Sequence, residues 1–266
     1  MMFDRFSNRV TLNGTLTAQT AIRIGAGRTA EITGTDLPVV RDTFGRPYIP
    51  GSSFKGALRS LIESLARSVK DSPKAACNPT NEKTWCLPSA EGKTDQEIEQ
   101  GICLVCHVFG SPWWASKVSI RDLCVEESLW AGQFENRNGV AIDRETETAA
   151  DQKLYNFEVV PAGTQFNCEI VVENAEDWEL GLLMLGLRPF ERGEAALGGA
   201  RSRGLGLVEL KWDSRKQIKG GEALLDYLVG DTAGEPISDE MVKGWVKEFR
   251  KELNKITISD GGQADA

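Results

Sequence analysis

The feature that most constrains the fold is a Pro-Gly-Ser-Ser turn that leads directly into an amphipathic segment. Apolar side chains recur after this turn at the spacing of one helix face. The sequence therefore predicts a helix from about Ser53 to Val69. A helix of this kind must bury its apolar face against a sheet or another helix. The residues on that face are Leu58, Leu61, Ile62 and Leu65.

The start of this helix is a candidate anion site. Ser52 and Ser53 can cap the helix, and free backbone N–H groups at a helix start attract anions. Lys55 and Arg59 add positive charge in the first turns, so a phosphate group is one expected ligand. An ordinary capped helix with solvated basic residues accounts for the same pattern, and the periodicity alone favours it.

A polar loop that contains glycine precedes the helix and carries Asp36. The loop covers residues 28–37 and follows an alternating apolar pattern from Val10 to Ile24, which predicts one or two half-buried strands. A loop aspartate can serve catalysis or hold a metal ion. It can also hydrogen-bond its own backbone in a turn, and the sequence around Asp36 taken alone favours that interpretation.

Four cysteines accompany a polar stretch that has no core of its own. Residues 71–101 show no sustained periodicity. Four thiolates suit a tetrahedral zinc ion, which can order such a loop. His107 can replace one cysteine as a ligand or pack locally, and Cys124 and Cys168 lie in apolar runs that predict burial. The four candidate ligands are Cys77, Cys86, Cys103 and Cys106.

Charge is unevenly distributed along the 266 residues, whose net charge is −8. The acidic excess argues against non-specific coating of nucleic acid, yet basic residues outnumber acidic ones eight to four between residues 23 and 70. Arg201 and Arg203 lie in a second basic cluster, in a loop where Gly199 lets the backbone approach a phosphate closely. The two clusters either line one groove or form two unrelated solvated faces, and a β-turn explains the glycines equally well.

The rest of the sequence predicts two further helices and gives no signal for a membrane or secreted protein. Densely apolar residues predict a buried helix from Trp178 to Leu187 that ends near Pro189, and another helix begins at Ser238. No apolar run reaches membrane-spanning length and no secretory signal is visible, so we expect a cytoplasmic protein without disulfides.

Four blocks together resemble the RAMP superfamily of CRISPR-associated proteins, and in particular the repeated backbone subunit of type III effector complexes. They occur in the family's order and cover most of residues 10–212, which is far more specific than any single block. The blocks are Pro47–Arg59, Cys103–Gly110, Ile142–Thr146 with Glu158–Gly163, and Gly198–Gly206.

The resemblance implies an α+β fold with a ferredoxin-like, RNA-recognition-type core. One RAMP domain is expected over residues 1–258, with a zinc-binding insertion at 71–106 and a projecting thumb hairpin at 136–156. Residues 259–266 are expected to be a disordered tail. In this family the thumb wedges between guide and target nucleotides. The candidate thumb contacts are Ile142, Arg144 and Thr146.

The resemblance also implies a function in antiviral defence. The chain would bind guide RNA within a ribonucleoprotein complex and cleave the complementary target RNA as a metal-dependent endoribonuclease, a hydrolase using Mg²⁺ or Mn²⁺. Asp36 falls where the family has its target-cleaving aspartate, although Leu37 replaces the usual asparagine of Asp-Asn-Pro. Expected partners are guide RNA, target RNA, other effector subunits, and repeated copies of this chain or related RAMP subunits. The RNA-binding candidates outside the thumb are Arg41, Ser52, Ser53, Lys55, Arg59, Gly199, Arg201 and Arg203.

Three alternatives stay open at this point. The first is a non-catalytic RNA-binding scaffold. The second is an endonuclease that processes repeat RNA, which often needs a histidine base, and His107 is the only histidine. The third is a zinc-containing ligand-binding or hydrolytic domain, although four cysteine ligands would leave no open position on the metal.

Overall fold

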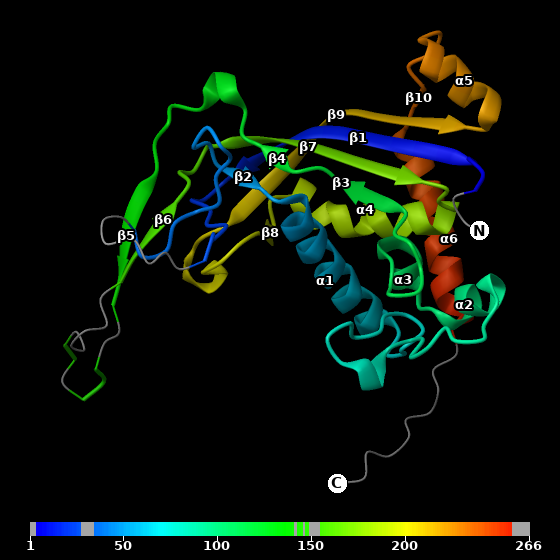
Figure 1. Cartoon of the computed structure of the whole chain (residues 1–266), viewed down its shortest axis with the longest axis horizontal. Coiled ribbons are helices and arrows are strands. Elements are labelled where there is room, and N and C mark those ends of the chain that lie inside the picture. Colours follow the sequence, from blue (N-terminus) through cyan, green and yellow to red (C-terminus); the bar gives the residue numbers. More distant parts are fainter. Residues whose placement is uncertain (1–3, 28–34, 141–142, 146, 149–154, 257–266) are drawn as a thin grey trace.

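The fold is built on a six-stranded antiparallel sheet with helices on one face. The computed structural model describes residues 4–27, 35–140, 143–145, 147–148 and 155–256 (Figure 1). The main path of the sheet has the order β10-β9-β1-β7-β3, and β8 pairs with β9. Its strands are β1 (Asn8–Ala18), β3 (Val118–Ile120), β7 (Gln165–Glu173), β8 (Ala195–Ala196), β9 (Leu207–Lys219) and β10 (Glu235–Pro236).

Two smaller sheets and six α-helices complete the described chain. One small sheet pairs β2 (Tyr48–Ile49) with β4 (Leu123–Cys124), and the other pairs β5 (Glu135–Gly139) with β6 (Tyr155–Val159). The helices are α1 (Gly51–Val69), α2 (Asp95–Gly101), α3 (Leu104–Phe109), α4 (Asp177–Glu191), α5 (Gly221–Val229) and α6 (Asp239–Lys255). Short 3₁₀ turns are η1 (Glu82–Thr84), η2 (Glu127–Leu129) and η3 (Arg201–Arg203).

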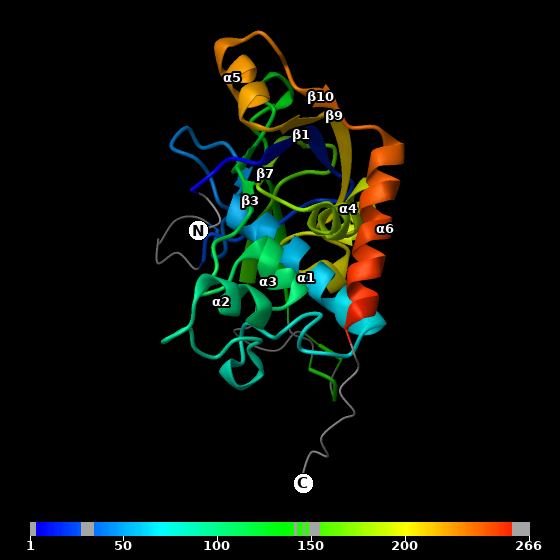
Figure 2. The ribbon, with the colours of Figure 1, turned by 90° about the vertical axis from the view of Figure 1, so that its right-hand side faces the viewer.

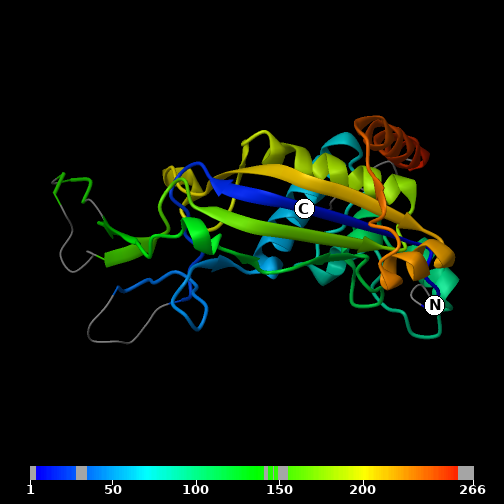
Figure 3. The same ribbon diagram turned by 90° about the horizontal axis from the view of Figure 1, so that it is seen from above.

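The alternating pattern of β1 explains its central place. Its apolar side chains point to one face, where Leu12 and Leu16 are fully buried, and the intervening residues are half-buried. Antiparallel β7 and β9 flank it on either side. Helices α1, α3, α4 and α6 lie beneath this face (Figures 1 and 2), and seen from above the long strands run across them (Figure 3). The core therefore lies between the sheet and these helices.

The C-terminal helix agrees with its pattern. The side chain of Ser238 caps α6, and Val242, Trp245 and Phe249 are buried. The preceding buried helix ends two residues beyond the expected Pro189, because α4 continues through Pro189 to Glu191. Pro189 lies in the last turn, where its missing N–H removes one hydrogen bond to the preceding turn without ending the helix.

Three other expectations also need correction. The helix predicted from Ser53 begins at Gly51 and has no side-chain cap, because the carboxylate of Asp122 accepts the Gly51 N–H at 2.8 Å. The stretch expected to be irregular contains α2, which begins with a capping box between Thr94 and Glu97. Cys124 is exposed, because its short strand β4 pairs with β2 at the margin of the fold, whereas Cys168 is buried as predicted.

None of the helices that the structure describes is both long enough and apolar enough to cross a membrane.

Candidate nucleic-acid interface and metal site

Asp36 lies where the loop before β2 meets the base of the β5–β6 hairpin. Its backbone N–H donates to Asn156 Oδ1 at 2.7 Å, and the Asn156 N–H donates to Asp36 Oδ2 at 2.9 Å. Leu37 then forms a parallel bridge with Phe157, so the loop adds briefly to strand β6. The Asp36 side chain is exposed, and its Oδ1 has no hydrogen-bond partner among the described residues. The carboxylate is therefore both oriented and accessible.

A pocket of about 480 Å³ opens beside this loop. Arg203 Nη1 donates to the Tyr155 hydroxyl at 2.9 Å, and the guanidinium of Arg23 lies 5.8 Å from the centre of the Phe157 ring. Arg23 Nε is buried without a hydrogen-bond partner in the described structure. Positive charge beside aromatic rings suits a nucleotide, because bases stack on the rings and arginines neutralise phosphate. The lining residues are Arg23, Leu37, Tyr155, Phe157, Ala200, Ser202 and Arg203.

The glycine-rich loop is held against the segment that carries Arg23. Gly199 N–H donates to Arg23 O at 2.8 Å, and Gly206 N–H donates to Ala21 O at 2.9 Å. Gly198 has φ +81°, and a Cβ atom there would lie 2.2 Å from Arg23 O, so only glycine fits this approach. These contacts bring Arg203 beside Arg23, although the two residues are far apart in sequence.

The hairpin expected from the resemblance begins with a paired ladder. Strands β5 and β6 pair from Glu135 opposite Val159 to Gly139 opposite Tyr155. Arg144 lies in a turn and is exposed, whereas Ile142 and Thr146 lie outside the described residues. Figure 1 shows that the hairpin projects from one end of the fold. The role of these residues in RNA binding stays a prediction.

The basic residues of α1 make contacts within the chain. Lys55 Nζ donates to Ser116 Oγ at 2.7 Å and to Val118 O at 2.8 Å, and burial lowers the pKa of this amine. Arg59 forms an ion pair with Glu63 at 2.8 Å and donates to Gly110 O at 3.0 Å. These contacts tie α1 to the segment between α3 and β3. Ser52 and Ser53 are exposed.

The other arginine candidates lie at separate places around the pocket. Arg41 forms an ion pair with Glu158, and its guanidinium lies 3.8 Å from the centre of the Phe134 ring. Arg201 is exposed and lines a second groove of about 800 Å³ beside α1. The structure therefore brings Arg203 and Asp36 to one region and leaves Lys55 and Arg59 in another.

Four cysteine side chains form a cluster that could hold a metal ion. The sulfur atoms of Cys77, Cys86, Cys103 and Cys106 all lie within 4.8 Å of one another. Thiol hydrogen bonds, chiefly from Cys103, lower the pKa of Cys77 and lower that of Cys86 to about 7. Arg59 Nη2 lies 3.5 Å from Cys106 Sγ, which adds positive charge beside the sulfur atoms.

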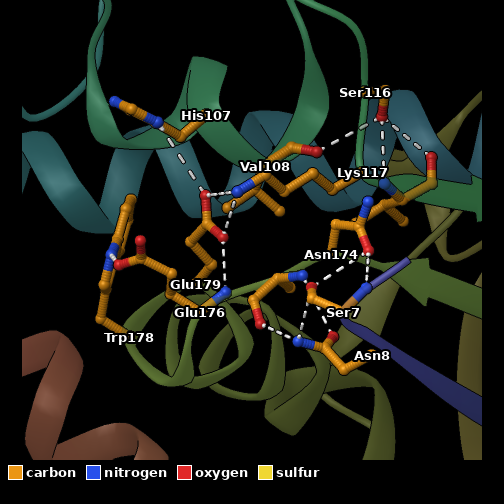
Figure 4. Close-up of polar contacts among 12 residues, drawn as sticks. Ser7, Asn8, His107, Val108, Ser116, Lys117, Asn174, Glu176, Trp178 and Glu179 are labelled. Carbon is orange, nitrogen blue, oxygen red and sulfur yellow. Dashed lines mark hydrogen bonds and ion pairs between the residues drawn. The ribbon is translucent and has the colours of Figure 1, made fainter. Parts of the chain in front are cut away.

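His107 points away from this cluster. Its Nδ1 lies 3.9 Å from a carboxylate oxygen of Glu179 (Figure 4), and its ring contacts Trp114 and Trp178 edge-on. Burial lowers the pKa of His107 to about 4. Among the described residues the potential metal-binding group consists of the four cysteines without His107.

A buried ion pair below α3 had no signal in the sequence pattern. Lys117 Nζ lies 2.6 and 2.7 Å from the two carboxylate oxygens of Glu179 (Figure 4), and both side chains are buried. Burial raises the pKa of Glu179 to about 7, and the charge of Lys117 opposes this rise. Glu179 also accepts the Glu176 N–H at 2.8 Å, so the pair fixes the start of α4. The Glu176-x-x-Glu179 spacing could have indicated this capping role, but not the partner Lys117.

The part of the chain that forms these sites matches a known protein family. Residues 15–209 match the RAMP superfamily. The chain is 28% identical over 264 residues to a protein named CRISPR system Cms endoribonuclease Csm3 from Methanothermobacter thermautotrophicus, covering 88% of this chain and 95% of that protein. The protein of the same name from Methanocaldococcus jannaschii is 28% identical over 261 residues, covering 93% and 94%. Another of that name, from Enterococcus italicus, is 26% identical over 216 residues, covering 80% and 94%. The chain therefore belongs to the RAMP superfamily.

Proposed function

We propose that this chain is a guide-RNA-binding backbone subunit of a type III CRISPR interference complex and that it also cleaves the complementary target RNA. Its similarity along most of its length to proteins named endoribonuclease Csm3 supports this class of function. The observation that carries the proposal is the exposed, oriented carboxylate of Asp36 beside a pocket of arginine and aromatic side chains. Guide RNA, target RNA, other effector subunits and further copies of the chain are its proposed partners, and a cytoplasmic location stays a prediction.

The proposed cleavage uses the free oxygen of Asp36. Oδ2 is held by the Asn156 N–H, so Oδ1 is available to accept a hydrogen bond from an RNA 2′-hydroxyl. The 2′-oxygen then attacks the adjacent phosphorus, the 2′-O–P bond forms and the P–O5′ bond breaks. The 2′-hydroxyl gives up its proton, and the departing 5′-oxygen takes one up. Arg203 and Arg23 are placed to neutralise phosphate charge in the same pocket.

A catalytic metal ion would need ligands from the RNA as well. Asp36 does not belong to any group of three or more potential ligands among the described residues. As the alternative use of the same free oxygen, we propose that Asp36 would supply one carboxylate ligand to Mg²⁺ or Mn²⁺, with RNA phosphates and water supplying the others. When bound, such an ion would stabilise negative charge on the phosphate.

The cysteine cluster suits structural zinc. Zinc–sulfur bonds of about 2.3 Å in a tetrahedron place sulfur atoms roughly 3.8 Å apart, and Cys77 Sγ and Cys106 Sγ are 3.6 Å apart. Four thiol donors, two from loop residues Cys77 and Cys86 and two from the start of α3, fit a closed site that orders the insertion at residues 71–106. We further propose a ferredoxin-like core, a single RAMP domain over residues 1–258, and a thumb at residues 136–156.

A reconstituted complex tests the catalytic proposal with two substitutions at Asp36. Asp36→Ala removes the carboxylate, and Asp36→Asn keeps a side-chain oxygen for the Asn156 N–H while it removes the charge. We expect both variants to bind target RNA and to lose its cleavage. Cleavage by the Asn variant at the native rate would remove Asp36 from the active site.

A specific contact favours one alternative, a non-catalytic scaffold. The reciprocal hydrogen bonds between Asp36 and Asn156 already give the aspartate a structural role at the hairpin base. A scaffold subunit would keep guide binding and show no dependence of cleavage on Asp36. The repeat-processing alternative is less favoured, because the one histidine is half-buried between Trp114 and Trp178 and its pKa is lowered to about 4.

A further inference from the structure

The groove between α4 and α6 combines an apolar floor with a ring of positive charge. It has a volume of about 420 Å³, and its floor consists of the half-buried Leu185 and Val246 and the buried Val242. No acidic side chain lines it. In a chain of net charge −8, such a local excess of cations indicates a partner that brings negative charge. The surrounding cations are Arg188, Arg192, Lys243, Lys247 and Arg250.

These cations are largely available for a partner. Arg188 pairs with Glu191 at 2.7 Å. For the other four, the described part of the chain supplies no ion pair, and all four side chains are exposed. Lys243 and Lys247 lie four residues apart on α6, so they share one face of the helix. Charge and apolar surface therefore face outward together.

Helix α5 presents the opposite combination. Leu225, Leu228 and Val229 are 63%, 66% and 71% exposed and lie at the spacing of one helix face. Glu222 and Asp226 lie beside this face and are exposed. Exposed apolar side chains grouped in this way are typical of an interaction surface. The described chain leaves this face uncovered.

We propose that α5 of one copy of the chain docks into the α4–α6 groove of a second copy. Leu225, Leu228 and Val229 would cover the apolar floor, while Glu222 and Asp226 would face Lys243 and Lys247. That copies of the chain contact one another is taken from the proposed function. The inference adds the two surfaces through which they bind. The fit is that of an amphipathic helix in a groove.

The positions of the two surfaces determine the kind of assembly. Helix α5 lies between β9 and the edge strand β10 in the chain and away from the helical face of the sheet, where α4 and α6 lie (Figures 1 and 2). Each copy therefore offers both halves of the contact at different places. Such a heterologous contact joins copies head to tail and can extend into a filament.

An RNA ligand fits the groove less well. RNA would satisfy the cations through its phosphates, but it presents no aliphatic side chains to the apolar floor. An acidic helix with an apolar face satisfies both features of the groove. The chain itself contains such a helix, which favours a second copy as the occupant.

Sedimentation of the purified full chain without RNA tests the proposal. We expect the native chain to form larger species as its concentration rises, with weaker association at high salt because opposite charges are screened. The groove variant Lys243→Glu/Lys247→Glu and the helix variant Glu222→Lys/Asp226→Lys should each lose these species. An equimolar mixture of the two variants should recover the larger species, because the reversed groove then meets the reversed helix and the unaltered helix meets the unaltered groove.

A control on the same helix separates this contact from a general charge effect. Lys251→Glu/Lys255→Glu makes the same charge change outside the groove and should associate like the native chain. Circular dichroism of every variant checks that the fold persists.

Several outcomes would overturn the proposal. A native chain that stays monomeric, reversed-charge variants that associate normally, or a mixture that fails to recover would each do so. If the native chain is monomeric, a separate binding measurement with guide RNA assigns the groove: loss of binding by the groove variant would identify it as a nucleic-acid surface. Because the sedimentation experiment contains no RNA, its failure is distinct from failure of target cleavage at Asp36.

Discussion

Glu179 shows how burial sets the behaviour of a single charged residue. It is 1% exposed, and its folded-state pKa of about 7 lies above its ordinary value of 4.5. The folded chain therefore binds this proton more tightly than the unfolded chain does. The raised pKa of Glu179 therefore adds to the free energy of unfolding in full below pH 4.5, and this addition is lost as the pH rises through about 7.

Glu179→Gln tests this sign, because glutamine keeps an acceptor for Lys117 and does not titrate. We expect the free energy of unfolding of the native chain, relative to the variant, to fall by roughly 3 kcal/mol between pH 4.5 and pH 7. Urea unfolding of both proteins at several pH values measures the difference. A difference that stays constant across this range would contradict the raised pKa.

Arg203 is the residue that best tests the pocket as an RNA site. Arg203→Ala should weaken binding of guide RNA. It should also make the fall of log binding constant with log salt concentration less steep by about one, because one phosphate contact is lost. Arg121→Ala removes an exposed arginine outside the pocket and should leave the slope unchanged. Equal effects of the two substitutions would show that only general charge matters.

At the scale of elements, the contact between α4 and α6 depends on a glycine. A Cβ atom on Gly181 would lie 2.1 Å from Trp245 O, so alanine there must push α6 away from α4. We expect Gly181→Ala to lower the free energy of unfolding by about 1–3 kcal/mol.

Gly244→Ala is the matched control on the facing helix. A Cβ at Gly244 meets no atom within 4 Å. Alanine has the higher helix propensity, so this variant should be more stable by up to about 1 kcal/mol. Chemical denaturation compares the two variants, and equal destabilisation of both would contradict close packing at Gly181.

The cysteine cluster is predicted to hold the segment around α2 and α3 in place. Cys77→Ser should lose the proposed zinc ion and increase hydrogen exchange in residues 71–106, while strands β1 and β9 stay protected. Cys124→Ser, at an exposed cysteine outside the cluster, should retain both the metal and the protection. Native metal content in Cys77→Ser would show that the cluster is not the zinc site.

The elements that the sequence predicted well are those with a local signal. In α1 and α6 the apolar residues recur at helical spacing, and in β1 apolar and polar residues alternate. Each pattern lies wholly within its own element, so it can be recognised without knowledge of the rest of the fold. The start of α1 was misplaced because Asp122, 71 residues away, satisfies its first N–H. Helix α2 was missed although Thr94 and Glu97 carry a capping signature, because residues 71–101 have no apolar period.

At the scale of the whole molecule, the candidate site could be predicted only in part. Asp36, Arg203 and the cysteines could be named from residue type and family resemblance. Asn156, which orients Asp36 across 120 residues, and Arg23, which joins the pocket through the glycine-rich loop, depend on tertiary contacts. The spacing of residues within one segment does not predict contacts with segments far away in the sequence.

The overall arrangement separates the proposed activities of the molecule. The β5–β6 hairpin and Asp36 lie at one end of the sheet, and α5 lies at the other (Figure 1). Basic side chains gather at the pocket beside Asp36 and at the α4–α6 groove, in a chain of net charge −8. RNA binding at one end and self-association elsewhere can therefore be altered independently.

Cleavage and binding of a guide-complementary RNA, measured on the same reconstituted complex with Mg²⁺ or with EDTA, test the central claim most directly. For native Asp36 we predict defined cuts with Mg²⁺ and none with EDTA. For Asp36→Ala we predict unchanged RNA binding and no cuts. Defined cuts that persist in the Asp36→Ala complex would contradict catalysis by this residue and leave the chain as a scaffold for RNA.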